Sequence, residues 1–83
     1  MVNRVLTLDG TPVTVNLEPV YWELLQARSA RDGLSADRYV ERNAPTRNPA
    51  ALARWVRTTC VNDLRERVER MRNRLDRRGG ATR

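Results

Sequence analysis

The chain has 83 residues, one cysteine and no histidine, and its net charge of +6 comes from 16 basic residues against 10 acidic ones. A lone Cys60 gives neither an internal disulfide nor the ligands of a zinc site, so we expect no metal or other cofactor. A chain this short buries little surface, and oligomerisation is the remaining common source of stability. We expect a cytoplasmic protein, since the start lacks the apolar run of a signal peptide and no stretch approaches the ~20 apolar residues that cross a bilayer.

The positive charge lies in the second half of the chain. Residues 1–48 carry equal numbers of arginines and acids, whereas residues 49–83 carry ten arginines and four acids and therefore hold the whole +6. A basic segment attracts phosphate, an anionic membrane surface or an acidic partner. It can also be a solvated helix face, and composition alone favours neither interpretation.

The first elements are predicted to be strands. Residues 13–17 alternate apolar and polar side chains with period two, residues 4–8 do so less regularly, and Asp9-Gly10 between them suits a tight type I′ turn. Both a hairpin and an extended arm followed by one strand fit this pattern. Because Pro12 has no amide to donate, we expect regular pairing to begin after it.

Two short helices should follow. Pro19 suits a first helical position, the stripe through Tyr21 and Leu24 has helical period, and Gly33 favours an end after Asp32. The second helix should begin with Ser35 as its N-cap, a position where a hydroxyl accepts an orphan amide hydrogen.

A long third helix is predicted from Asn48-Pro49 to the glycines at 79–80, with residues 79–83 as a disordered tail. Its first half is apolar on several sides and should be buried. Its second half has one narrow seam, spaced 3, 4, 3, 4, which is typical of a short coiled coil. The seam can pack on a partner helix or on its own domain. It consists of Val61, Leu64, Val68, Met71 and Leu75.

Three segments resemble a bacterial ribbon-helix-helix subfamily. Residues 10–25 (GTPVTVNLEPVYWELL) are similar to its strand running into an aromatic-bearing helix, residues 31–35 (RDGLS) to its turn between helices, and residues 48–56 (NPAALARWV) to its third helix. The resemblance covers about residues 4–60. It departs at Pro12, where the subfamily often has a basic residue, which puts the usual base contact there in doubt.

The resemblance implies a mostly helical α+β fold in which two chains pair their strands into an antiparallel ribbon that enters the DNA major groove. Residues 1–47 would form the DNA-binding core, and residues 48–78 a helix that packs dimers or tetramers. It implies base contacts from the outward strand residues, Pro12, Thr14 and Asn16. We also expect a dimer interface made by Val13, Val15, Leu17 and Trp55 together with two residues of the seam, Leu64 and Val68.

A second implied site is the start of the second helix, whose free amides would hold a DNA phosphate. These amides belong to Ser35 and Ala36, and Arg38 and Arg4 are further candidates for phosphate contact. Asp37 beside them would repel the phosphate unless its carboxylate points away.

The resemblance therefore favours a transcriptional regulator, most simply a repressor acting on the nucleoid as a dimer or a pair of dimers. Antitoxins and plasmid-maintenance proteins use the same scaffold. From another class, the chain can be an adaptor whose basic third helix binds a protein partner. We expect no membrane binding, because the seam is narrow, and no catalysis, because no histidine, carboxylate pair or glycine-rich phosphate loop supports it.

Overall fold

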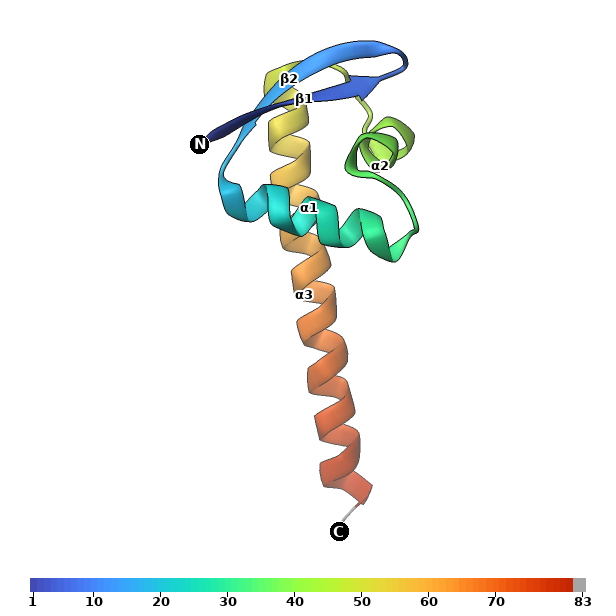
Figure 1. Cartoon of the computed structure of the whole chain (residues 1–83). Helices are drawn as coiled ribbons and strands as arrows, with labels where there is room; N and C mark the ends of the chain where they lie inside the picture. Colours follow the sequence, from blue (N-terminus) through green and yellow to red (C-terminus); the bar gives the residue numbers. More distant parts are fainter. Residues whose placement is uncertain (82–83) are drawn as a thin grey trace.

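A computed structural model describes the backbone of residues 1–81 and the side chains of residues 1–74. Strands β1 (Val2–Leu8) and β2 (Thr11–Leu17) are followed by helices α1 (Pro19–Arg31), α2 (Ala36–Asn43) and α3 (Pro49–Ala81). The two strands lie across one end of the molecule, α1 and α2 lie on one side of them, and α3 runs away from the sheet past α1 (Figure 1). The strand-then-helices order that the sequence predicts is confirmed.

The two strands form a hairpin within one chain. They pair antiparallel from Val2 opposite Leu17 to Leu8 opposite Thr11. Asp9 and Gly10 close the turn with φ of 54° and 78°, the left-handed conformation at both positions that a type I′ turn requires. So short a loop costs little chain entropy, which explains why β2 finds a partner strand in its own chain. Of the two alternatives left open by the sequence, the hairpin is the one that forms.

The expectation that pairing begins after Pro12 is wrong. Pro12 lies inside β2, opposite Thr7, and pairing begins at Thr11. In a hairpin with a two-residue turn, the pair next to the turn is hydrogen-bonded and the following pair is not, so Pro12 stands where β1 needs no amide from it. The amide that Pro12 lacks would have pointed to the outer edge of β2, away from β1.

The predicted helix ends are largely confirmed. The Ser35 hydroxyl accepts a hydrogen bond from the Arg38 amide at 3.3 Å, and the Asn48 carboxamide oxygen accepts one from the Ala51 amide at 3.1 Å. Gly33 has φ of 71°, and the Leu34 amide bonds back to the Ser29 carbonyl, which closes the end of α1. These caps set where α1 ends and where α2 and α3 begin.

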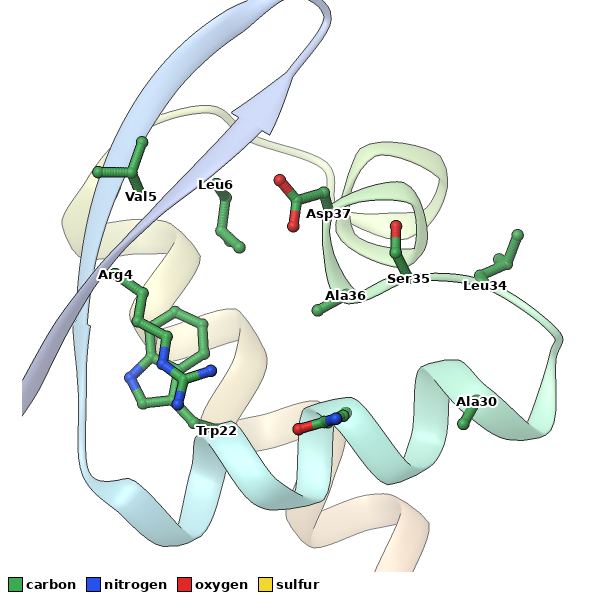
Figure 2. A pocket seen from close by; sticks show the side chains of 10 residues that line it. Arg4, Val5, Leu6, Trp22, Ala30, Leu34, Ser35, Ala36 and Asp37 are labelled. Carbon is green, nitrogen blue, oxygen red and sulfur yellow. The ribbon is translucent and has the colours of Figure 1, made fainter.

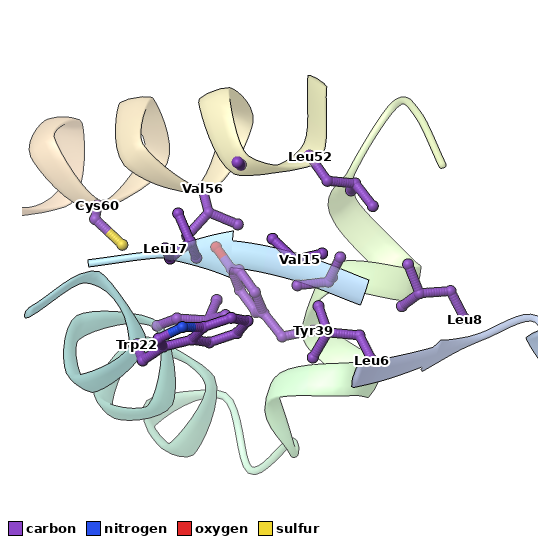
Figure 3. Close-up of a cluster of buried hydrophobic side chains, with 12 residues drawn as sticks. Leu6, Leu8, Val15, Leu17, Trp22, Tyr39, Leu52, Val56 and Cys60 are labelled. Atoms are coloured by element: carbon purple, nitrogen blue, oxygen red, sulfur yellow. The ribbon is translucent and has the colours of Figure 1, made fainter. Parts of the chain in front are cut away.

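The core lies between the inner face of the hairpin and the three helices (Figure 3). Alternate strand residues point into it, as period two requires. Among the described side chains, α3 contributes to it only near its start, and the last buried one is that of Cys60. The buried hydrophobic residues are Leu6, Leu8, Val15, Leu17, Trp22, Leu25, Tyr39, Val40, Leu52, Ala53, Val56 and Cys60.

α3 extends well beyond the residues with which it packs against the rest of the chain. The molecule measures 57 × 24 × 19 Å, and its long dimension follows α3 (Figure 1). The predicted helix end at the glycines 79–80 is wrong, because the helix continues through them to Ala81. The rest of the predicted tail, residues 82–83, lies outside the described residues. No helix in the described part of the chain is long and apolar enough to cross a membrane.

Candidate nucleic-acid interface

The outer face of the hairpin is a small, uncharged polar surface. Since directly opposite residues share a face, the register assigns three side chains from each strand to it. All are exposed, and none of them is charged at neutral pH. These residues are Asn3, Val5 and Thr7 from β1 and Pro12, Thr14 and Asn16 from β2.

The three side chains predicted to contact bases, Pro12, Thr14 and Asn16, lie together on this face. Their β1 neighbours Asn3 and Val5 were not predicted, because the sequence leaves the pairing of residues 4–8 undecided. The signal that finds them is the Asp9-Gly10 turn, which fixes the register and so places Asn3 opposite Asn16 and Val5 opposite Thr14.

The residues predicted at a dimer interface lie in three different places. Val15 and Leu17 are fully covered within a single chain, and Val13 is half-buried beside them. Trp55 is half-buried, with its ring 6.3 Å from that of Tyr39. The other two, Leu64 and Val68, are exposed on the distal part of α3. Their role between chains stays a prediction.

The two edges of the hairpin differ. On the β1 edge, the Thr7 amide donates to a carboxylate oxygen of Asp37 at 2.7 Å, and the Asp9 amide donates to Glu41 at 3.2 Å. On the β2 edge, no hydrogen bond in the described part of the chain joins the outward amides of Thr14 and Asn16 to another element. The edge of β1 is therefore capped by α2, whereas the outward amides of β2 have no such cap among the described residues.

A cavity of about 440 Å³ opens between β1, α1 and the start of α2 (Figure 2). Three of the four predicted phosphate contacts line it, Arg4 from β1 and Ser35 and Ala36 from α2, while Arg38 lies outside it. The guanidinium of Arg4 is 5.4 Å from the centre of the Trp22 ring, whose Nε1 donates to the Val2 carbonyl at 2.9 Å. Packing on Trp22 thus places this cation in the wall of the cavity that Ser35 and Ala36 also line.

Asp37 lines the same cavity, and the hydrogen bond from the Thr7 amide holds its carboxylate toward β1 (Figure 2). The acid that seemed unfavourable beside a phosphate therefore has a structural partner. It joins α2 to the edge of the hairpin and still leaves a negative charge near the helix N-terminus.

Other charged side chains join the elements that hold this surface. Arg57 of α3 binds both carboxylate oxygens of Glu18, at 2.6 and 3.0 Å, and lowers the pKa of that carboxyl below its ordinary value. Arg31 hydrogen-bonds Asp63 and likewise lowers its pKa, with a smaller contribution from Arg28. These pairs connect the strand-to-helix junction and α1 to α3, so their role is structural.

Metal binding and thiol chemistry find little support among the residues that the structure describes. The described part of the chain holds no group of three or more cysteines and acids that could bind a metal ion. Burial raises the pKa of the Cys60 thiol to about 11, which keeps it protonated and unreactive at neutral pH.

The model of the ribbon-helix-helix domain family matches residues 1–64, which include the hairpin, α1, α2 and the packed half of α3. The chain is a ribbon-helix-helix protein. Members of this family are typically DNA-binding transcription regulators without enzymatic activity, and they generally bind DNA as dimers. Comparison with curated proteins and with solved structures finds no match.

The basic charge of this ribbon-helix-helix protein is not at its hairpin. The distal part of α3 carries Arg65, Arg67, Arg70, Arg72 and Arg74, and it lies at the end of the molecule opposite the strands (Figure 1). A duplex on the outer face of the hairpin would therefore be held by polar side chains and the α2 N-terminus, with these arginines directed away from it.

Proposed function

We propose that this ribbon-helix-helix protein binds double-stranded DNA sequence-specifically as a dimer, through the outer face of its hairpin, and acts in the cytoplasm as a transcriptional repressor. The observation that carries the proposal is the composition of that face. It presents amides and hydroxyls from both strands, with no charge, on a two-stranded ribbon that the major groove is wide enough to admit.

The chemistry of these side chains suits base edges. The carboxamide of Asn16 can form a bidentate pair with adenine, and Thr14 can bond a base edge or touch a thymine methyl. Pro12 adds an apolar contact without a donor. Each good bidentate pair is worth ~1–3 kcal/mol of discrimination against a wrong base.

The open edge of β2 is where we place the second chain. Two β2 strands that pair antiparallel would bring both copies of Thr14 and Asn16 to the middle of a four-stranded sheet. Its outer strands would be about 14 Å apart, wider than the ~12 Å groove. The central β2 strands would then face the bases, and the β1 strands, bent away by the sheet twist, would lie nearer the phosphates.

The cavity at the α2 N-terminus supplies the phosphate contact in this arrangement. The amides of Ser35 and Ala36 together with the Arg4 guanidinium favour an anion. Such contacts set the position of the protein on the duplex, while the outer face of the hairpin selects the sequence.

The proposal is tested by selecting bound duplexes from a randomised DNA pool at low and moderate salt. We expect a repeated motif that persists at the higher salt, and we expect Asn16→Ala or Thr14→Ala to relax the preference at one position in each half-site. Charge-driven binding alone would give no motif and would fall steeply as salt rises. That outcome, or unchanged selectivity in both variants, overturns the proposal.

A further inference from the structure

The distal half of α3 carries a row of apolar side chains that nothing in the described part of the chain covers. Val61 is 42% exposed, Leu64 39%, Val68 49% and Met71 63%. We call these four residues the α3 seam. Leu75 continues their spacing, but its side chain lies outside the described residues. Apolar side chains at this spacing normally meet a partner helix, because the spacing keeps them on one line.

The seam is separate from the face by which α3 joins its own domain. The core-facing residues of α3 include Val56 and Cys60, and Asp63 continues their face and pairs with Arg28 and Arg31 of α1. At 3.6 residues per turn, the seam lies roughly a quarter turn around the helix from that face. Bending of the distal half of α3 toward α1 would therefore not cover the α3 seam.

Arginines flank the seam on both sides. Arg65 and Arg72 follow seam residues on one side, and Arg67 and Arg74 precede them on the other. Leu64, Val68, Arg65 and Arg72 line one shallow groove together with Glu69. In coiled-coil terms, every flanking position between Leu64 and Arg74 is arginine, and these are the positions whose charges select a partner.

This pattern disfavours a second copy of α3. In a parallel pair, Arg67 of one chain would face Arg72 of the other, and in an antiparallel pair each flanking row would face its own counterpart. Both orientations place like charges together, which repels. The distal half of α3 also lies at the end of the molecule opposite the hairpin, so its arginines are not needed for a duplex bound to the hairpin (Figure 1).

We propose that the α3 seam binds an amphipathic helix of another protein, whose apolar residues meet Val61, Leu64, Val68 and Met71 and whose flanking acidic residues meet the arginines on either side. A phosphate backbone would pair with the arginines but would leave the α3 seam exposed to water. A membrane surface favours a broader apolar face with bulky aromatic residues, and no aromatic residue follows Trp55. An acidic helix satisfies both features together.

The test uses the full-length protein and two synthetic helical peptides with leucine at the seam positions. One peptide has glutamate at its flanking positions, and the other has lysine. Fluorescence anisotropy measures the affinity of each labelled peptide. We expect the glutamate peptide to bind and the lysine peptide not to bind. Val68→Asp should weaken binding of the glutamate peptide about tenfold or more. Since Val68 is exposed, circular dichroism should show an unchanged fold.

A matched pair of charge reversals tests whether the arginines beside the seam bind the peptide or whether any arginine on the helix does. Arg72→Glu should weaken binding of the glutamate peptide several-fold, whereas Arg70→Glu, on another face and 3.6 Å from Glu66, should change it little. Equal effects of the two variants, or equal binding of the two peptides, would overturn the proposal. So would self-association in sedimentation that Val68→Asp abolishes, or binding to vesicles of phosphatidylglycerol in place of the peptide. Because the hairpin takes no part, these outcomes leave the proposed DNA binding to its own test.

Discussion

Asn3 and Asn16 lie directly opposite each other in the hairpin, on the same outer face, one from each strand. They have the same side chain and both are exposed. They differ in the edge beside them, because the edge of β1 is capped by α2 at Thr7 and the edge of β2 is not. Substituting each asparagine in turn therefore tests whether two chains join through β2 or a single hairpin contacts the DNA by itself.

Asn16→Ala should lower the affinity for the selected duplex about tenfold and relax the preference at one base position, whereas Asn3→Ala should change affinity less and selectivity hardly at all. The reason is that a β2-joined dimer puts Asn16 over the bases and Asn3 nearer the phosphates. Electrophoretic mobility shifts with matched and mismatched duplexes measure both quantities. Equal losses of selectivity in the two variants would instead indicate that one hairpin enters the groove with both strands against the bases.

Substitution of Asp37 should raise DNA affinity, whereas substitution of Asn16 should lower it. Asp37→Asn keeps an oxygen that can accept from the Thr7 amide, while it removes a negative charge from the cavity formed with Arg4 and Ser35. DNA affinity should therefore rise about threefold at low salt, and the gain should shrink as salt is added. Glu41→Gln is the control, since Glu41 also accepts a backbone amide of the hairpin, that of Asp9 in the turn, but does not line the cavity. A loss of affinity in Asp37→Asn would argue against phosphate binding at this helix start.

Local features of the sequence were enough to predict most of the fold. Ser35 and Gly33 mark helix boundaries through their own chemistry, and the period of residues 13–17 identifies β2 and its outward side chains. The sequence left open whether residues 4–8 pair with β2, and Asn3 was therefore not recognised as part of the outer face, although the Asp9-Gly10 turn fixes its register once they pair. The bond from the Thr7 amide to Asp37, 30 residues further along, joins distant elements, and no local pattern signals it.

The turn residue Gly10 should be more sensitive to substitution than its exposure suggests. Its φ of 78° is a conformation that side chains with a Cβ disfavour, although no neighbouring atom lies where a Cβ would go. Gly10→Ala should therefore cost about 1 kcal/mol in the free energy of unfolding, measured with urea. Gly10→Asn should cost less, because asparagine tolerates the left-handed region better. If the two variants are equally stable to urea, backbone strain does not limit the turn.

Asp63 should make stability depend on acid pH. Its bond to Arg31 holds the pKa of its carboxyl below the ordinary value, so the folded state releases this proton more readily than the unfolded state does. The stabilisation is complete above the unfolded pKa and is lost as pH falls through the lower folded value. Urea midpoints between about pH 6 and about pH 3 should therefore fall less steeply in Asp63→Asn than in the original chain. Asp32→Asn is the matched control, because Asp32, at the end of α1, bonds Arg28 of the same helix and does not join α1 to α3. A pH profile that Asp63→Asn leaves unchanged would show that the Arg31–Asp63 pair contributes nothing to the α1–α3 contact.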